Sequence, residues 1–201
     1  MEGGWRSPDP GFRAMQRAVR SGAASADDVV DFWSWAGPGR WFTKDAAFDA
    51  MFRDAFLDRH FDAACGRLHS WLATARGTLA VLILLDQFPR NSFRGSPRMF
   101  WTDRLARLVA DRGIRHGLDV QVEDHGLRNF CYLPFVHSER LEDQERAVAL
   151  TSTLSTDAGW HARVHRDIIR RFGRFPHRNA VLGRSTTAQE QAFLDAGGFA
   201  G

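Results

Sequence analysis

Cysteine is scarce in this chain of 201 residues: only Cys65 and Cys131 occur, too few and too far apart for a disulfide framework or a zinc site. Both are expected to be core residues rather than nucleophiles. Long hydrophobic runs are also missing, because the longest one, 79–85, falls far short of the ~20 residues that cross a bilayer. The first residues carry no basic segment followed by an apolar stretch, which a secretory signal would need. We therefore expect a soluble, cytoplasmic protein with no membrane partner.

Lysine is almost absent as well. Lys44 is the only lysine among 27 basic residues, and the net charge is only +3. An excess of arginine fits the recognition of carboxylates or phosphates, because the guanidinium group presents a planar fork of donors. The codon usage of a high-GC genome explains the same excess equally well. A functional arginine therefore has to be identified by its position in the chain.

No run alternates between apolar and polar residues for long enough to predict a β-strand, whereas apolar residues recur at helical spacing. Capping-box patterns predict that a first helix begins at Ser25 with Asp28, and a last helix at Thr186 with Gln189. The connections are mostly short, which favours antiparallel helical hairpins. No period of about 34 residues recurs, which excludes a regular repeat array. The sequence therefore predicts an all-α fold.

Glycine and proline are concentrated near the amino terminus, where residues 1–24 contain four glycines and two prolines and show only weak periodicity. We expect a weakly ordered extension at 1–24. The regular helical signals that follow predict a single helical domain at 25–201.

The stretch 78–87 is apolar on every side and is predicted to be the central buried helix, ended by Pro89. Pro89 belongs to a short pattern that occurs twice: 88–91 is FPRN, and 175–179 is FPHRN. Each copy follows a predicted helix and delivers an arginine and an asparagine from a turn. Further helices are expected at 96–113, 138–154 and 157–172, the last closed by Gly173.

The first candidate ligand-binding cluster surrounds the first copy of this pattern and consists of Asp86, Gln87, Arg90, Asn91 and Arg94. Asp86 lies at the carboxyl end of the most buried helix, where the helix dipole and desolvation both disfavour a negative charge. It therefore needs a cationic partner, for which Arg90, Arg94 and Arg178 are candidates. The cluster is either a buried clamp that locks two turns together or the floor of a ligand pocket.

The second cluster comprises His137, Ser138, Glu139 and Gln144. Ser138 is predicted to be the N-cap of the helix at 138–154, which puts His137 just before the helix and Glu139 in its first turn. A histidine and a carboxylate so close together are typical of a general acid/base pair. Glu139 is alternatively an ordinary helix-start carboxylate, and Gln144 either caps a loop or contacts a ligand.

The third cluster extends from His161 to Arg184. His161 and His165 have the spacing of a helical metal pair, but no third ligand follows at a fixed spacing, so neither a metal nor a cofactor is expected. The same two histidines suit core positions. The side chains at the end of this helix and in the loop that follows are candidates for binding an anion: Arg171, Arg174, His177, Arg178, Asn179 and Arg184.

Three stretches that carry these clusters resemble the signatures of the bacterial "domain of unknown function 924" family: LLDQFPRN at 84–91, YLPF at 132–135 with HSE at 137–139, and FGRFPHRN at 172–179 with LGR at 182–184. The similarity extends from about residue 28 to about residue 194. It implies a tetratricopeptide-like, right-handed helical array without strict repeats, and no established activity. His165 matches the family pattern, whereas His161 stands where an aromatic residue is expected.

These observations favour a polar pocket that binds a small anionic ligand, either a carboxylate or a phosphate. The candidates for acid–base catalysis in it are His137, Glu139, His165 and His177, and whether the protein is an enzyme is left open. One alternative is a tetratricopeptide-like scaffold that binds a peptide or protein. The other is RNA binding through the seven arginines of 161–184, but these are dispersed around the helix, so no nucleic-acid partner is expected.

Overall fold

A computed structural model describes residue 16 and residues 24–201. The predicted amino-terminal extension at 1–24 thus lies outside the described residues, apart from positions 16 and 24. Every regular element of the described part is helical, which confirms the predicted all-α class. Among the described helices, none combines the length and the apolar character that a bilayer span requires.

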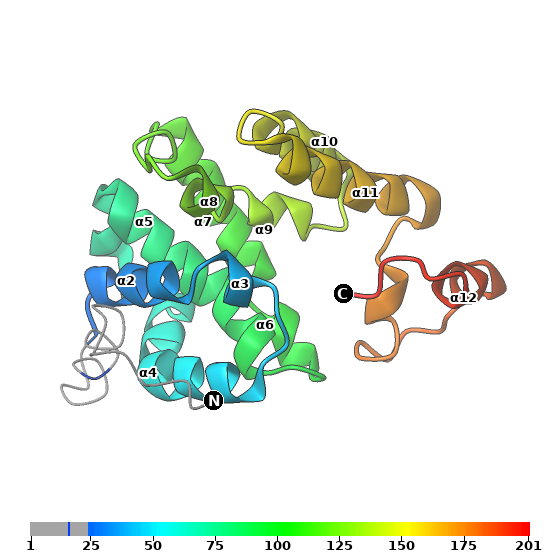
Figure 1. The fold of residues 1–201 in the computed structure, drawn as a ribbon, viewed down its shortest axis with the longest axis horizontal. Coiled ribbons are helices and arrows are strands. Elements are labelled where there is room, and N and C mark those ends of the chain that lie inside the picture. Colours follow the sequence, from blue (N-terminus) through cyan, green and yellow to red (C-terminus); the bar gives the residue numbers. More distant parts are fainter. Residues whose placement is uncertain (1–15, 17–23) are drawn as a thin grey trace, which may run out of the picture.

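The chain folds into short helices joined by turns (Figure 1). Most are α-helices; η1, η3 and η4 are 3-10 helices, and η2 is a π-helix. In chain order the elements are α2 (Ala26–Ala36), α3 (Pro38–Trp41), α4 (Ala46–Ala64), η1 (His69–Ala73), α5 (Ala75–Leu82), η2 (Ile83–Gln87), α6 (Phe88–Ser92), η3 (Pro97–Phe100), α7 (Asp103–Arg115), α8 (His125–Asn129), α9 (Leu133–Val136), α10 (Leu141–Thr151), α11 (Thr156–Phe172), η4 (Pro176–Arg178) and α12 (Ala188–Asp195). Helices α10 and α11 pack against each other across a short connection, as expected for a helical hairpin. The tetratricopeptide-like arrangement stays a prediction.

Local capping signals account for several helix ends. Ser25 and Asp28 form a capping box at the start of α2, as predicted. Gly173 ends α11 with φ +70, a left-handed conformation that glycine adopts without strain. The capping box of the last helix is made by Thr187 with Glu190, so the prediction of Thr186 with Gln189 is wrong by one residue. The predicted helix at 96–113 is divided into η3 and α7.

The central helix does not end at Pro89, contrary to the prediction; α5 continues through η2 into α6. The Phe88 N–H donates to the carbonyl of Ile83, five residues earlier, which is the bonding pattern of a π-helix. Pro89, the next residue, has no N–H to donate. The carbonyls of Leu84 and Leu85 therefore need other donors. His60 Nδ1 lies 2.9 Å from the Leu84 oxygen, and the Thr102 hydroxyl donates to the Leu85 oxygen at 2.5 Å. Because these two contacts provide partners for both carbonyl oxygens, the buried helix continues past the proline.

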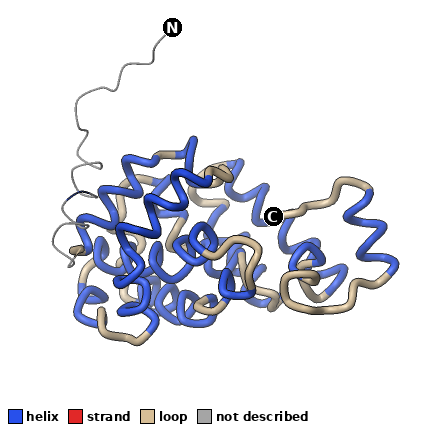
Figure 2. The backbone as a smooth tube through the Cα atoms, turned by 90° about the horizontal axis from the view of Figure 1, so that it is seen from below, coloured by secondary structure: helices blue, strands red, loops and turns tan. Residues whose placement is uncertain are grey.

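Two groups of buried apolar residues stabilise the fold. The larger one is rich in aromatic rings; Phe32, for example, stacks on Phe52 with ring centroids 5.4 Å apart. The smaller one lies toward the carboxyl terminus and contains Ile168, Ile169 and Phe175. Figure 1 and Figure 2 both place α12 at one end of the molecule, apart from most other helices. The single domain expected at 25–201 stays a prediction.

The two cysteines differ in burial. Cys131 is buried, as expected. Cys65 is exposed, so the prediction that it belongs to the core is wrong. It lies at the carboxyl end of α4, where the chain turns away from the helix face that carries the core phenylalanines.

Candidate functional site

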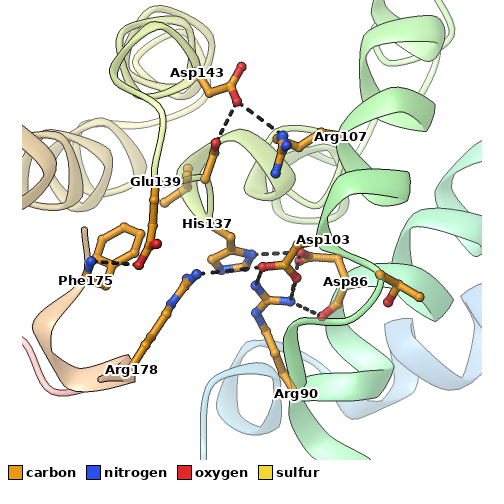
Figure 3. A network of polar contacts seen from close by, with 12 residues as sticks. Asp86, Arg90, Asp103, Arg107, His137, Glu139, Asp143, Phe175 and Arg178 are labelled. Atoms are coloured by element: carbon orange, nitrogen blue, oxygen red, sulfur yellow. Dashed lines mark hydrogen bonds and ion pairs between the residues drawn. The ribbon is translucent and has the colours of Figure 1, made fainter. Parts of the chain in front are cut away.

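The centre of the polar cluster is Asp86, which lies in η2 and is almost completely buried. Three side chains contact its carboxylate: His137 Nδ1 lies 2.8 Å from Oδ1, Gln87 donates to Oδ2 at 2.6 Å, and Arg90 Nη1 lies 3.1 Å from Oδ1. Figure 3 shows the contacts of His137 and Arg90 with Asp86. Of the cationic partners predicted for Asp86, the structure supplies Arg90. The histidine comes from the end of α9, about fifty residues along the chain.

Opposing effects determine the ionisation of this pair. Burial raises the pKa of Asp86, but the charge of Arg90 and the contacts of His137 and Gln87 outweigh burial and hold that pKa below its usual value. Burial lowers the pKa of His137, the charge of Arg90 lowers it further, and Asp86 offsets this only in part. The ring is therefore neutral at pH 7. Since an ionised Asp86 only accepts, Nδ1 carries the proton and Nε2 keeps its lone pair.

A second carboxylate, Asp103, lies at the start of α7 beside this pair. It receives a bidentate pair of hydrogen bonds from Arg90, at 2.9 and 3.1 Å. Arg90 also donates to the backbone carbonyl of Asp86 at 2.7 Å. The nearest Arg178 nitrogen, Nη1, is 3.8 Å from Asp103, which is an ion pair beyond hydrogen-bond distance. Asp103 thus joins the two FP-containing segments. The first of them lies in helix α6, so the prediction that this copy forms a turn outside a helix is wrong.

Arg178 differs from every other arginine of this cluster. Its side chain is 8% exposed, yet its guanidinium makes no hydrogen bond to any side chain or backbone group within 24–201, and its Nε is buried without a partner. Cζ lies 4.6 Å from the centre of the Phe100 ring and 4.4 Å from that of Phe175. Burial lowers the pKa of Arg178 to about 10, and the charge of Arg90 adds to this effect. Burial and the neighbouring cation thus outweigh the charges of Asp103, Glu139 and Asp86, which act on this pKa in the opposite direction.

Glu139 does not pair with His137, contrary to the predicted acid/base pair. Helix α10 begins at Leu141, so Ser138 is not its N-cap and Glu139 precedes its first turn. The Ser138 hydroxyl instead donates to Asp143 at 2.6 Å. Arg184 donates to both Glu139 oxygens at 2.8 and 3.0 Å, and the Phe175 N–H donates to Oε1 at 2.9 Å. Glu139 thus fastens the 175–184 segment to the start of α10.

Two of the predicted ligand-binding pairs are bound to carboxylates outside the centre. Arg94 and Asn91 both donate to Asp49 of α4, Asn91 at 2.7 Å. At the carboxyl end, Arg174 donates to both oxygens of the buried Glu190 at 2.6 and 2.8 Å. Asn179 donates to the same carboxylate at 3.3 Å. The first cluster thus joins the α6 region to α4, and the second joins the 174–179 segment to α12.

Gln144 supports the turn that carries His137. The amide is fully buried and donates from Nε2 to the carbonyl oxygens of Val136 and Ser138, at 2.7 and 2.6 Å. Of the two alternatives for this residue, the structure therefore has the loop cap. These bonds fix the backbone on both sides of His137.

The other two histidines predicted to be catalytic, His165 and His177, lie among aromatic rings. His165 is buried against Phe199 with ring centroids 4.4 Å apart, and burial lowers its pKa to about 4. His177 packs on Phe199 at 5.1 Å, and burial lowers its pKa to about 3. His161 is exposed, whereas His165, four residues later on the same helix, is buried. Among the described residues, no three metal-binding side chains converge.

The comparisons with known proteins agree with the three motif stretches. The model of the family described as "bacterial protein of unknown function (DUF924)" matches residues 29–198. The chain belongs to this family. It is 53% identical to a protein of unknown function from Agrobacterium tumefaciens, ATU0120, whose solved structure superposes with a TM-score of 0.83 over 85% of this chain and 97% of that one. No curated protein matches the chain.

Four site residues of this DUF924 chain escaped the sequence analysis: Asp49, Phe100, Asp103 and Glu190. Asp49 had a usable signal, because it lies among Phe48, Phe52 and Phe56 on the apolar face of its helix. Asp103 had none, since an acidic residue in the first turn is favoured in any helix. A carboxylate that binds two distant arginines looks the same in sequence as one that only caps a helix.

Proposed function

We propose that the cluster around Asp86, His137, Asp103 and Arg178 binds a small anionic ligand, and that His137 acts on it as a general base. The observation that carries the proposal is the Arg178 guanidinium, which is largely buried but makes no hydrogen bond to the described protein. An unsatisfied buried donor costs roughly 1–3 kcal/mol, and more when the group is charged. An anion that accepts from the two terminal nitrogens would give this guanidinium hydrogen-bond partners that the described protein does not supply.

The pair of Asp86 and His137 supports the catalytic part of the proposal. A neutral imidazole whose Nδ1–H is bonded to a carboxylate presents a lone pair on Nε2. In the proposed step, Nε2 removes a proton from the ligand or a bound water, and the bonding electrons stay on the atom that loses the proton. Asp86 then stabilises the imidazolium. Glu139 does not take part in proton transfer in this scheme, because Arg184 and Phe175 occupy its oxygens.

Neither alternative function has comparable support. Peptide binding rests on the fold alone, and a fold does not determine a function. RNA binding would use the arginines of 161–184, but Arg170, Arg174 and Arg184 are paired with Glu145, Glu190 and Glu139. Exposed basic side chains that are neutralised in this way contribute little to phosphate binding.

The proposal is tested by NMR titration of the full chain with sodium acetate, sodium benzoate and inorganic phosphate at constant ionic strength. At least one of these anions should shift the His137 ring signals in a saturable way and raise the His137 pKa, because a bound anion favours the imidazolium. Arg178→Gln should abolish the response. Arg171→Gln is the matched control, since Arg171 stacks on Phe172 elsewhere on α11. If no anion affects His137 in the parent chain, the proposal is wrong.

A further inference from the structure

We infer that the ligand bound at Arg178 is a carboxylate rather than a phosphate, held through the two terminal nitrogens of the guanidinium. This inference rests on the proposed function and specifies the chemical class of its ligand. Three features of the site carry it: the part of Arg178 that remains available, the number of unengaged cations, and the carboxylates around them.

Only one edge of the Arg178 guanidinium is available to a ligand. The Phe100 and Phe175 rings cover it with hydrocarbon from two directions, at 4.6 and 4.4 Å from Cζ. Nε is buried, so the edge that combines Nε with a terminal nitrogen is closed. The edge formed by Nη1 and Nη2 remains, and its two parallel N–H groups match the two oxygens of one carboxylate.

The other cations of the site are already engaged. Arg90 donates to Asp103 through both terminal nitrogens and also to the Asp86 carbonyl. Arg184 donates to both oxygens of Glu139. A ligand therefore meets one guanidinium, that of Arg178, which makes no hydrogen bond within 24–201 and whose ion pair with Asp103 is long, at 3.8 Å.

A phosphate dianion is disfavoured by the carboxylates of the same site. Asp103 lies 3.8 Å from Arg178 Nη1, and both Glu139 and Asp86 act on the pKa of Arg178 through their charges. The second charge of a phosphate would face these carboxylates without a cation of its own. Nor does His137 supply a donor, because its proton is on Nδ1 and points to Asp86. Both costs are smaller for a monoanionic carboxylate, which carries one negative charge fewer and needs fewer donors.

The test compares acetate with inorganic phosphate at pH 7.5 and constant ionic strength, using chemical-shift titrations of the parent chain, Arg178→Gln and Arg178→Lys. Acetate should bind the parent at least about tenfold more tightly than phosphate, which is the difference of roughly one well-placed charged hydrogen bond. Arg178→Lys should lose most of the acetate affinity, because an ammonium group is a point donor that cannot hold both oxygens in parallel. Arg171→Gln should behave as the parent does.

The possible results separate this inference from the proposed function. Phosphate binding that equals or exceeds acetate binding and depends on Arg178 overturns the carboxylate inference and leaves the proposed function standing. Absence of any Arg178-dependent binding overturns both. Equal acetate affinity in the parent and Arg178→Lys overturns the bidentate contact. If Arg178→Gln does not fold, the acetate-to-phosphate ratio of the parent chain still decides between the two ligand classes.

Discussion

The two FP-containing segments are each built around a single helical turn, α6 for 88–91 and η4 for 175–179, and they use the same residue types in nearly the same way. In each, the phenylalanine is completely buried and the arginine reaches Asp103. In each, the asparagine donates to a carboxylate that also binds another arginine: Asp49 in the first turn and Glu190 in the second. Both turns are therefore fastened by the same kind of clamp.

The difference between them lies in the arginine. Arg90 makes three hydrogen bonds, two to the Asp103 carboxylate and one to a backbone carbonyl. Arg178 makes none to the described residues and rests between aromatic rings. The same motif thus supplies one arginine that is fully engaged in holding the fold together and one whose donors make no hydrogen bond within 24–201.

The largest expected effect is on the first turn. Arg90→Met should reduce the free energy of unfolding by roughly 3–5 kcal/mol, because it leaves Asp86 and Asp103 buried without their main cation. Urea denaturation measures the loss. A loss below about 1 kcal/mol would contradict the assignment of Arg90 to the fold.

The clamp of the second turn should have the next largest effect. Glu190→Gln should cost roughly 1.5–3 kcal/mol, since a neutral amide replaces a buried carboxylate that accepts from Arg174, Asn179 and the Thr187 N–H. Thermal unfolding measures this cost. Glu123→Gln is the control, because it makes the same exchange of carboxylate for amide at an exposed position. Equal stability of Glu190→Gln and the parent would show that this clamp is dispensable.

His177, the histidine of the second FP-containing segment, should make the free energy of unfolding depend on pH. The pKa of His177 is about 3 in the folded protein and near 6.5 when unfolded, so below pH 6.5 the unfolded chain takes up a proton that the folded chain refuses. Stability should therefore fall from pH 6.5 to 5, by about 2 kcal/mol for this one residue.

His177→Phe should remove that part of the pH dependence, because an apolar ring suits its position against Phe175 and Phe199. Denaturant titrations at pH 7.5 and 5 measure the difference. The exposed His116 provides the control variant His116→Asn, which should keep the parent slope. An unchanged slope in His177→Phe would mean that His177 is protonated in the folded state.

The smallest effect is expected for Arg178 itself. Arg178→Met should lower the free energy of unfolding by less than about 1 kcal/mol, because no hydrogen bond is lost and the methionine chain fits between the rings. The same urea denaturation as for Arg90→Met measures it. A loss as large as that of Arg90→Met would remove the contrast between the two turns.

The sequence was sufficient for the features that depend on local patterns. The helical class, the Ser25 capping box and the Gly173 helix end all follow from neighbouring residues. The burial of Asp86 and its need for a cation also follow, since an acid within an apolar helix cannot remain unpaired.

The sequence was insufficient where the deciding contact is distant. Pro89 ends a helix only if the carbonyl it frees finds no donor, and here the Thr102 hydroxyl, thirteen residues on, provides one. The choice of partner for Glu139 is similar, because Arg184 lies 45 residues away along the chain. Such pairings depend on the packing of helices and leave no periodic signal.

The most direct test of the difference between the two arginines is the side-chain ¹⁵Nη spectrum of the parent chain, recorded before and after addition of sodium acetate. Acetate should shift the Arg178 signals in a saturable way and leave those of Arg90 in place, because only Arg178 has donors to offer. Unchanged Arg178 signals, or shifts of the same size at Arg90, would contradict the account.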